Sequence, residues 1–383
     1  MKILIAGAGI GGLTAALCCT RRGMDVQVFE KAPELSEVGA GIQISPNAMR
    51  VFQKLGLDKA IIAKGFVPGK LEARMGQSGR VLFAIGAQSY GAPYVHIHRA
   101  DLIEILSAAL PKDVIRLGKT VTGYEQSNDD ASLTFADGTN VSGDYLIGAD
   151  GIHSIIRAQM IGPSQPRFTG NLAWRAIVPT ERLGDLTPDP NATVWMSDKS
   201  HVVTYRLRGG ALTNFVGIVE RDDWQQESWT ERGDLSDLKS DFKNWHPIIE
   251  NVIQNIDPDD LFKWALFDRG PLPRWTAGRV TMLGDAVHPM LPFMAQGAAM
   301  AIEDGYVLAD CLARGKLDEY HRLRLARTSR IQAQSRANMT TFHRSRGLGR
   351  LSYVPMWLAG RIAPPLVSRR FNWIYGFDAT KQI

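Results

Sequence analysis

Two side chains that could exchange a proton stand close together in the middle of the chain. His201 opens the run His-Val-Val-Thr-Tyr, which ends at Tyr205. Residues four apart in an extended strand lie on the same face, so both side chains should point the same way. Histidine titrates near neutral pH and suits a general base, and a tyrosine could orient it. A capped histidine at a strand start and a core tyrosine form the structural alternative.

A glycine-rich turn near the N-terminus could hold phosphates. It follows the apolar run Lys2–Ala6, and helical spacing then continues to Arg22. A second apolar run, Asp25–Phe29, ends in the acidic Glu30. In a strand–turn–helix unit such glycines allow a tight turn, close approach to a pyrophosphate and close packing of helix and strand. The acid would accept hydrogen bonds from a ribose diol. These residues predict dinucleotide binding by Gly7, Gly9, Gly11, Gly12 and Glu30.

Two later strands also end in an acidic residue. Tyr145–Gly148 leads into Asp150-Gly151, and Arg279–Leu283 leads into Gly284-Asp285. Ligands of open α/β sheets bind at the carboxyl ends of strands, so both acids should lie at the dinucleotide site.

These three motifs, in this order, resemble those of the class A flavoprotein aromatic hydroxylases. The resemblance runs over nearly the whole chain and is strongest to the group of salicylate hydroxylase, 3-hydroxybenzoate 6-hydroxylase and 6-hydroxynicotinate 3-monooxygenase. It includes Gly39-Ala40-Gly41-Ile42-Gln43, His98-Arg99 and the stretch Trp373–Asp378. The resemblance implies FAD as cofactor, with NADH or NADPH as a transient co-substrate. The implied cofactor contacts are Gly7, Gly9, Gly11, Gly12, Glu30, Lys31, Gly41, Ile42, Arg99, Val121, Asp150, Arg157, Gly284, Asp285, Gln296, Gly297 and Ala298.

The same resemblance implies a reaction. Reduced flavin and O2 would give a flavin hydroperoxide, which hydroxylates a small phenolic aromatic acid of salicylate type. His201 would remove the proton of the substrate hydroxyl, with Tyr205 beside it, and His288 is the rival base. Pro292, Phe293 and Met294 would form an apolar wall that excludes water, and Gln43 would line the same site.

The sequence differs from two relatives at the expected substrate site. Phe293 and Gln43 stand where the 6-hydroxynicotinate enzyme has histidines, which weakens the case for a pyridine substrate. Pro292 stands where the 3-hydroxybenzoate enzyme has a glutamine. Arg74 and Arg206 are the candidates for binding a substrate carboxylate. The ring position, loss of CO2 and the choice between NADH and NADPH stay open.

The expected architecture is α/β, with a Rossmann-like FAD-binding domain, an inserted antiparallel-sheet substrate domain and a helical C-terminal segment. Short alternating runs between residues 167 and 266 indicate the inserted sheet. We assign 1–75, 96–166 and 267–345 to the FAD-binding domain, and 76–95 with 167–266 to the substrate domain. Residues 346–383 should pack on the molecule or form a dimer interface.

Composition excludes several classes of protein. The 383 residues are 45% hydrophobic and 22% charged, which is ordinary for a globular chain. Three cysteines offer neither a disulfide framework nor a metal-ligand pattern, so we expect no metal and a cytoplasmic location. No apolar run is long enough for stable membrane insertion.

Charge is concentrated toward the end of the sequence. From Arg314 onward there are 14 basic and 3 acidic residues, a net charge of +11. We interpret Arg322, Arg324, Arg327, Arg330 and Arg336 as a solvent-facing helix side rather than a nucleic-acid site.

Two other functions stay open at this point. A flavin halogenase would need a second tryptophan near Trp174–Pro179, where the sequence has one. A non-catalytic flavin-binding protein would bind FAD without oxidising NADH in the presence of any phenol.

Overall fold

The glycine-rich turn lies at the carboxyl end of a central strand in a six-stranded sheet. The computed structural model describes residues 1–35, 41–221, 231–344 and 347–382. The sheet order is β17-β18-β11-β1-β2-β7, and all neighbours are parallel except β17 and β18. Glu30 and Asp150, the acids that follow Asp25–Phe29 and Tyr145–Gly148, therefore lie at the same edge of the sheet. The strands are β1 (Lys2–Ala6), β2 (Asp25–Phe29), β7 (Ile115–Arg116), β11 (Tyr145–Gly148), β17 (Thr276–Ala277) and β18 (Val280–Met282).

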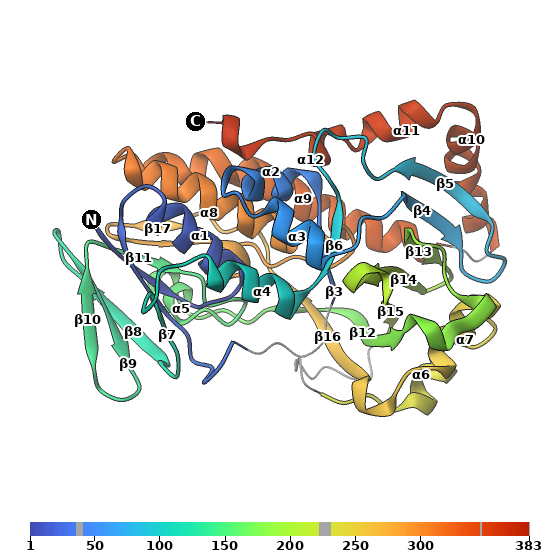
Figure 1. The fold of residues 1–383 in the computed structure, drawn as a ribbon, viewed down its shortest axis with the longest axis horizontal. Helices are drawn as coiled ribbons and strands as arrows, with labels where there is room; N and C mark the ends of the chain where they lie inside the picture. Colours follow the sequence, from blue (N-terminus) through green and yellow to red (C-terminus); the bar gives the residue numbers. More distant parts are fainter. Residues whose placement is uncertain (36–40, 222–230, 345–346, 383) are drawn as a thin grey trace.

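Helices cover this sheet, and two of them pack against each other beside the glycine-rich turn (Figure 1). α1 (Ile10–Thr20) packs closely on α8 (Gly297–Ala313), because Gly305 leaves room for the backbone of Ala15. A Cβ at Gly305 would lie 2.9 Å from the Ala15 nitrogen. The other helices of this half are α2 (Pro46–Lys54), α3 (Asp58–Lys64), α4 (Arg99–Ala108) and α5 (Ile155–Ile161).

A seven-stranded sheet forms the second half of the molecule. Its order is β16-β12-β15-β14-β13-β4-β5, and only β13 and β4 are parallel. The predicted strands of the inserted region are present, and β4 joins them although the expected boundary placed residues up to 75 with the FAD-binding domain. The strands are β4 (Lys70–Met75), β5 (Val81–Gly86), β12 (Arg167–Pro179), β13 (Ala192–Met196), β14 (Ser200–Leu207), β15 (Leu212–Glu220) and β16 (Phe262–Asp268).

Smaller elements complete the two halves. β3 (Gly41–Ile44) pairs with β6 (Val95–His98). A separate antiparallel sheet lies beside the six-stranded one, and two helices share an apolar core with the seven-stranded sheet. These are β8 (Val121–Gln126), β9 (Ala131–Phe135) and β10 (Asn140–Gly143), and the helices α6 (Leu235–Asp241) and α7 (Pro247–Gln254).

The long helix α9 (Leu317–Phe342) reaches from one half to the other. Its 26 residues span about 39 Å at 1.5 Å per residue. Three short helices follow, α10 (Val354–Ile362), α11 (Pro364–Arg370) and α12 (Asn372–Tyr375). In Figure 1, α10 and α11 form the red segment above β4 and β5, and both helices contact β5. Two of the C-terminal helices thus contact the seven-stranded sheet, and a role of this segment in a dimer interface stays a prediction.

The expectation of a solvent-facing basic side on α9 is wrong for two of its arginines. Arg324 is fully buried and Arg327 is 9% exposed. Arg324 pairs with Asp304 at 2.7 Å and with Glu303 at 2.8 Å, and Arg327 pairs with Glu303 at 2.7 Å. Helical spacing could not show this, because the acidic partners lie on α8. Arg322, at 76% side-chain exposure, does face solvent.

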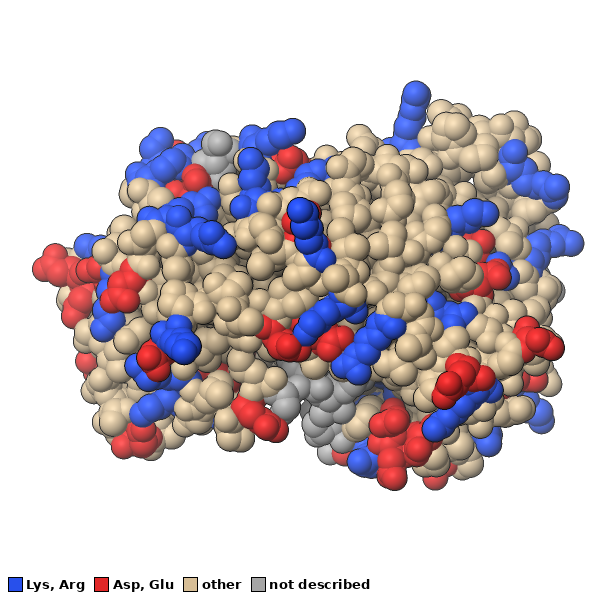
Figure 2. Space-filling model, in the orientation of Figure 1, with Lys and Arg blue, Asp and Glu red and all other residues tan. Residues whose placement is uncertain are grey.

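Surface charge follows the uneven sequence. In Figure 2, basic side chains predominate along the upper edge, over the C-terminal helices, and both signs are mixed lower down. Among the helices in the described ranges, none has both the length and the apolar character needed to cross a bilayer.

Candidate functional site

A groove of about 330 Å³ opens at the glycine-rich turn. It lies where β1, β2 and β11 end, which is the position expected for a ligand in such a sheet. Seven of the predicted cofactor residues line it together. These are Gly7, Gly9, Glu30, Lys31, Arg99, Val121 and Asp150.

Three glycines of the turn play different parts. Gly7 has φ +105°, and a Cβ there would lie 2.4 Å from the carbonyl oxygen of Ala149. A Cβ at Gly12 would lie 2.0 Å from the carbonyl oxygen of Gly7, so this glycine allows the helix to pack on the turn. Gly9 has no atom within 4 Å of its Cβ position. The space at Gly9 is therefore free for a ligand, and helix α1 begins directly after it.

The acids of the groove are placed to receive donors. Glu30 Oε2 accepts from the Ala8 nitrogen at 2.8 Å and Oε1 from the Ala32 nitrogen at 3.0 Å, which leaves further lone pairs for a ribose diol. Asp150 Oδ2 accepts from the Ile155 nitrogen at 2.8 Å. Its Oδ1 is buried and has no hydrogen-bond partner among the described residues. Burial raises the pKa of Asp150 despite these donors. These residues fit the ribose and pyrophosphate of FAD.

The loop after β18, which carries Asp285, lies beside the loop after β11, which carries Asp150, because the two strands are neighbours in the sheet. Arg157 donates from Nη1 to the carbonyl of Ile152 at 2.8 Å and to that of Ala286 at 3.4 Å. It therefore ties the loop after β11 to the loop after β18. Asp285 is exposed at this edge of the sheet, and desolvation by the surrounding protein raises the pKa of its carboxyl. The Gly284 nitrogen donates to Asp304 at 3.1 Å.

The remaining predicted cofactor residues lie outside the groove. Gly11 packs on α8, since its Cβ would lie 3.1 Å from that of Ala301. Gln296 is buried just before α8, where its Nε2 donates to Ser45 at 3.0 Å. Gly41 donates its N–H to Asn214 Oδ1 at 3.0 Å. Gly297 and Ala298 begin α8, and Ile42 lies on β3. Their contact with FAD stays a prediction.

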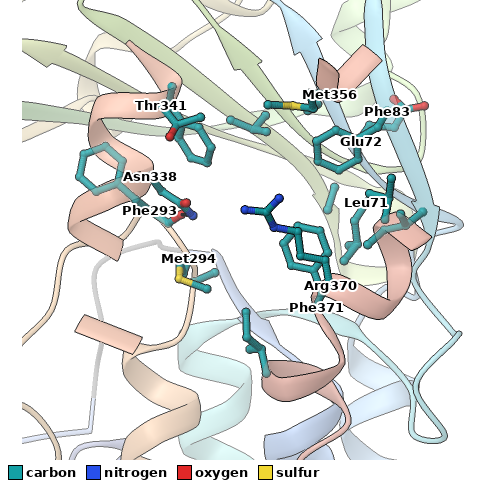
Figure 3. A pocket seen from close by; sticks show the side chains of 18 of the residues that line it. Leu71, Glu72, Phe83, Phe293, Met294, Asn338, Thr341, Met356, Arg370 and Phe371 are labelled. Carbon is teal, nitrogen blue, oxygen red and sulfur yellow. Dashed lines mark hydrogen bonds between the residues drawn. The ribbon is translucent and has the colours of Figure 1, made fainter. Parts of the chain in front are cut away.

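A second, larger cavity of about 720 Å³ lies between the seven-stranded sheet, α9 and the C-terminal helices (Figure 3). It brings together five of the predicted site residues, namely His201, Gln43, Pro292, Phe293 and Met294. The structure also places here residues that sequence reasoning missed. They include Leu71, Glu72, Phe83, Asn338, Thr341, Phe342, Met356, Arg370, Phe371 and Trp373.

His201 lies in the wall of this cavity and is 1% exposed. Its ring centroid is 5.0 Å from that of Phe293 and 5.2 Å from that of Phe342. Its Nδ1 lies 2.9 Å from His343 Nε2. Burial lowers the pKa of His201 well below the usual range, and His343 adds to this effect. The imidazole is therefore neutral at physiological pH.

Tyr205 shares the strand with His201 but has different neighbours. Its ring centroid is 4.7 Å from that of His96, and its ring fills the space beside Gly41. Tyr205 is not among the residues that line the cavity, and burial raises the pKa of its hydroxyl. The structure thus brings Tyr205 to the β3 side of the site. Its role next to a substrate hydroxyl stays a prediction.

Arginine and histidine candidates outside the cavity have other partners. Arg74 pairs with Glu72 at 2.9 Å and also contacts Asp189. Arg206 donates to the carbonyl of Pro188 at 2.7 Å. Neither lines the cavity, whereas Arg370 does, and its guanidinium points into the open space in Figure 3. The rival base His288 is held by Asp304, with 2.5 Å between Nε2 and Oδ2.

Fold and site together define a nucleotide-binding α/β protein with a separate, largely apolar cavity for a small molecule. The family model described as an FAD binding domain matches residues 1–335. The chain is 36% identical to 6-hydroxynicotinate 3-monooxygenase of Pseudomonas fluorescens, over 98% of this chain and 95% of the relative. It is 36% identical to 3-hydroxybenzoate 6-hydroxylase 1 of Aquipseudomonas alcaligenes, over 100% and 99%.

A solved structure agrees with these two relatives. A salicylate hydroxylase in complex with its substrate superimposes with a TM-score of 0.83 at 26% identity, covering 99% of this chain and 96% of that one. The chain therefore belongs to the FAD-binding class A monooxygenases and is an FAD-dependent aromatic monooxygenase.

Proposed function

We propose that this chain hydroxylates a small phenolic aromatic acid of salicylate type, using NADH or NADPH and O2. The observation that carries the proposal is the pairing of two groups in one cavity. His201, neutral and buried, provides a base, and Arg370 provides a cation that reaches into the open space. Among the described residues Arg370 has no carboxylate partner of its own, so it is available to a substrate carboxylate.

The chain's own residues would perform three tasks. Arg370 would hold the carboxylate of the acid and so orient the ring. His201 would accept the hydroxyl proton at Nε2, because its Nδ1 is occupied by His343, and the resulting phenolate pushes electron density into the ring. Phe293, Pro292 and Met294 would keep water away from the reacting atoms. When bound, reduced FAD with O2 supplies the electrophilic oxygen.

The test is a panel of acids given to the FAD-loaded enzyme with NADH or NADPH. Salicylate, 3-hydroxybenzoate and 6-hydroxynicotinate are compared by oxygen uptake, hydroxylated product and released CO2. Stoichiometric product from a phenolic acid supports the proposal, and CO2 release marks attack at the carboxyl-bearing carbon. A preference for 6-hydroxynicotinate would replace salicylate with a pyridine as substrate class. NAD(P)H oxidation that no acid accelerates would overturn the proposal.

Arg370→Gln tests the carboxylate contact directly. Loss of a charge-assisted pair costs about 1.5–3 kcal/mol, which corresponds to a KM increase of about 10- to 150-fold. Arg369→Gln is the matched control, because this neighbour on α11 does not line the cavity. The kcat of Arg370→Gln at saturating acid should change much less than its KM. Equal KM values for the two variants would remove Arg370 from the substrate site.

A further inference from the structure

A chain of hydrogen bonds leads from the cavity to the surface through two histidines. His201 Nδ1 lies 2.9 Å from His343 Nε2, and His343 Nδ1 lies 2.8 Å from Glu220 Oε1. The side chain of His343 is 2% exposed, whereas that of Glu220 is 41% exposed. His201 lies on β14, Glu220 ends the neighbouring β15, and His343 directly follows α9. Three separate segments therefore meet to form one continuous path.

The ends of this path fix the proton positions along it. A carboxylate can only accept, so His343 must donate from Nδ1 and can accept at Nε2. His201 must then donate from Nδ1, which leaves the lone pair of its Nε2 for a ligand in the cavity. The arrangement presents the acceptor that a general base needs.

Burial explains why His201 needs a partner. An imidazolium in this site would be surrounded by the rings of Phe293 and Phe342 and shielded from water. A lone buried charge is costly, so a proton that stayed on His201 would make deprotonation of a substrate unfavourable. Passing the proton outward removes that cost. Besides Glu220, the charge of Asp198 acts on His343.

We propose that His201, His343 and Glu220 form a proton-release path from the substrate hydroxyl to solvent. The substrate O–H bond breaks as an N–H bond forms at His201 Nε2. The Nδ1 proton of His201 moves to His343 Nε2, and the Nδ1 proton of His343 moves to Glu220 and then to water. One proton leaves, the substrate becomes a phenolate, and both histidines stay neutral. Return of a proton along the path restores the starting tautomers.

The proposal rests on the proposed function, since it needs an ionisable hydroxyl, so one test avoids any substrate. ¹⁵N-histidine NMR of the FAD-loaded enzyme reports which ring nitrogen carries the proton. We expect the Nδ1–H form for His201 and His343, and a change at His343 in Glu220→Gln. An Nε2–H form for His201, or signals unaltered by Glu220→Gln, would overturn the path whatever the substrate is.

The second test measures proton transfer without turnover. The probe is a hydroxybenzoate with a nitro group para to the hydroxyl, whose phenolate absorbs visible light. It is mixed rapidly with oxidised, FAD-loaded enzyme in the absence of NAD(P)H. Glu220→Gln should slow phenolate formation by about 10²-fold or more, within the range for loss of a proton-transfer group. The Kd of the probe should stay within about twofold, because Glu220 does not line the cavity. Glu125→Gln, an exposed acid on β8, is the control.

His343→Ala separates proton transfer from a structural role. It should slow phenolate formation more than Glu220→Gln does, and added imidazole should restore the rate. Wild-type rates in both variants, or a slower rate that imidazole leaves unchanged, would overturn the path. If the NMR result holds but the wild-type enzyme never ionises the bound probe, the proposed phenol chemistry fails and the hydrogen-bond chain stands.

Discussion

The nucleotide groove takes most of its lining from the ends of β1, β2 and β11 and the loops that follow them, with further residues from α4 and the start of β8, whereas the lining of the cavity comes from stretches spread between Gln43 and Tyr375. In the groove, the backbone at Gly7, Gly9 and Gly12 shapes the space for the ligand. In the cavity, side chains from β4, β14, α9 and α11 converge. The shape of a site formed by backbone depends on a few local residues. The shape of a site formed by side chains from several elements depends on how those helices and strands pack.

The largest expected effect lies in the cavity. His201→Ala should keep bound FAD and slow hydroxylation by about 10²- to 10⁴-fold, the usual loss for a general base. Val203→Ala, on the same cavity wall but without a titratable group, is the control. Product formation and flavin absorbance of each purified variant are measured together. A His201→Ala enzyme that loses FAD but hydroxylates normally once reconstituted would refute the base assignment.

The second effect concerns the buried ion pairs that hold α9 on α8. Arg324→Met should lower the free energy of unfolding by about 3–5 kcal/mol, because it leaves Glu303 and Asp304 short of a buried partner. Burial alone would raise the pKa of Glu303, but Arg324 and Arg327 outweigh it and lower that pKa. Arg322→Met, exposed on the same helix, should cost less than about 1 kcal/mol. Urea unfolding of both variants makes the comparison, and equal midpoints would contradict it.

The third effect tests the backbone-built groove. Gly9→Ala meets no atom within 4 Å in the protein and has an extended φ of −69°, so the variant should fold normally. Its methyl group would occupy the space of the pyrophosphate, and FAD affinity should fall by about 5- to 150-fold, as expected for overpacking by about 1–3 kcal/mol. Gly270→Ala also adds a methyl into open space, but away from the groove. Unchanged FAD affinity in Gly9→Ala would show that the cofactor lies farther from this turn.

The smallest effect is a pH dependence of stability near the boundary of the two regions. Burial lowers the pKa of His96 to about 3. The unfolded chain takes up a proton there below about pH 6.5, whereas the native state does not, so stability falls as pH drops from about 6.5 toward 3. His96→Phe should reduce this slope by up to about 1.4 kcal/mol per pH unit. Urea unfolding between about pH 7 and pH 5, with the exposed His153→Phe as control, measures it. Identical slopes for His96→Phe and wild type would refute it.

The structure could be predicted from the sequence where a local pattern determines a local shape. The turn at Gly7–Gly12, the acid Glu30 and the strands around His201 are all present where predicted. The places of Arg370 and Phe371 in the cavity could not be predicted, because their distance from His201 depends on how α11 packs on β5. His343 was missed for the same reason. The error at Arg324 and Arg327 arose because an arginine pattern alone does not reveal buried acidic partners on another helix.

The position of the C-terminal helices has a consequence for how this enzyme could diversify. Met356, Arg370 and Trp373 line the cavity, yet no residue of α10, α11 or α12 lines the nucleotide groove. Substitutions in these helices can change the shape of the substrate cavity without changing the residues that line the nucleotide groove. A lineage could thus change which aromatic compounds it accepts by substitutions in these helices, while the residues that line the nucleotide groove stay the same.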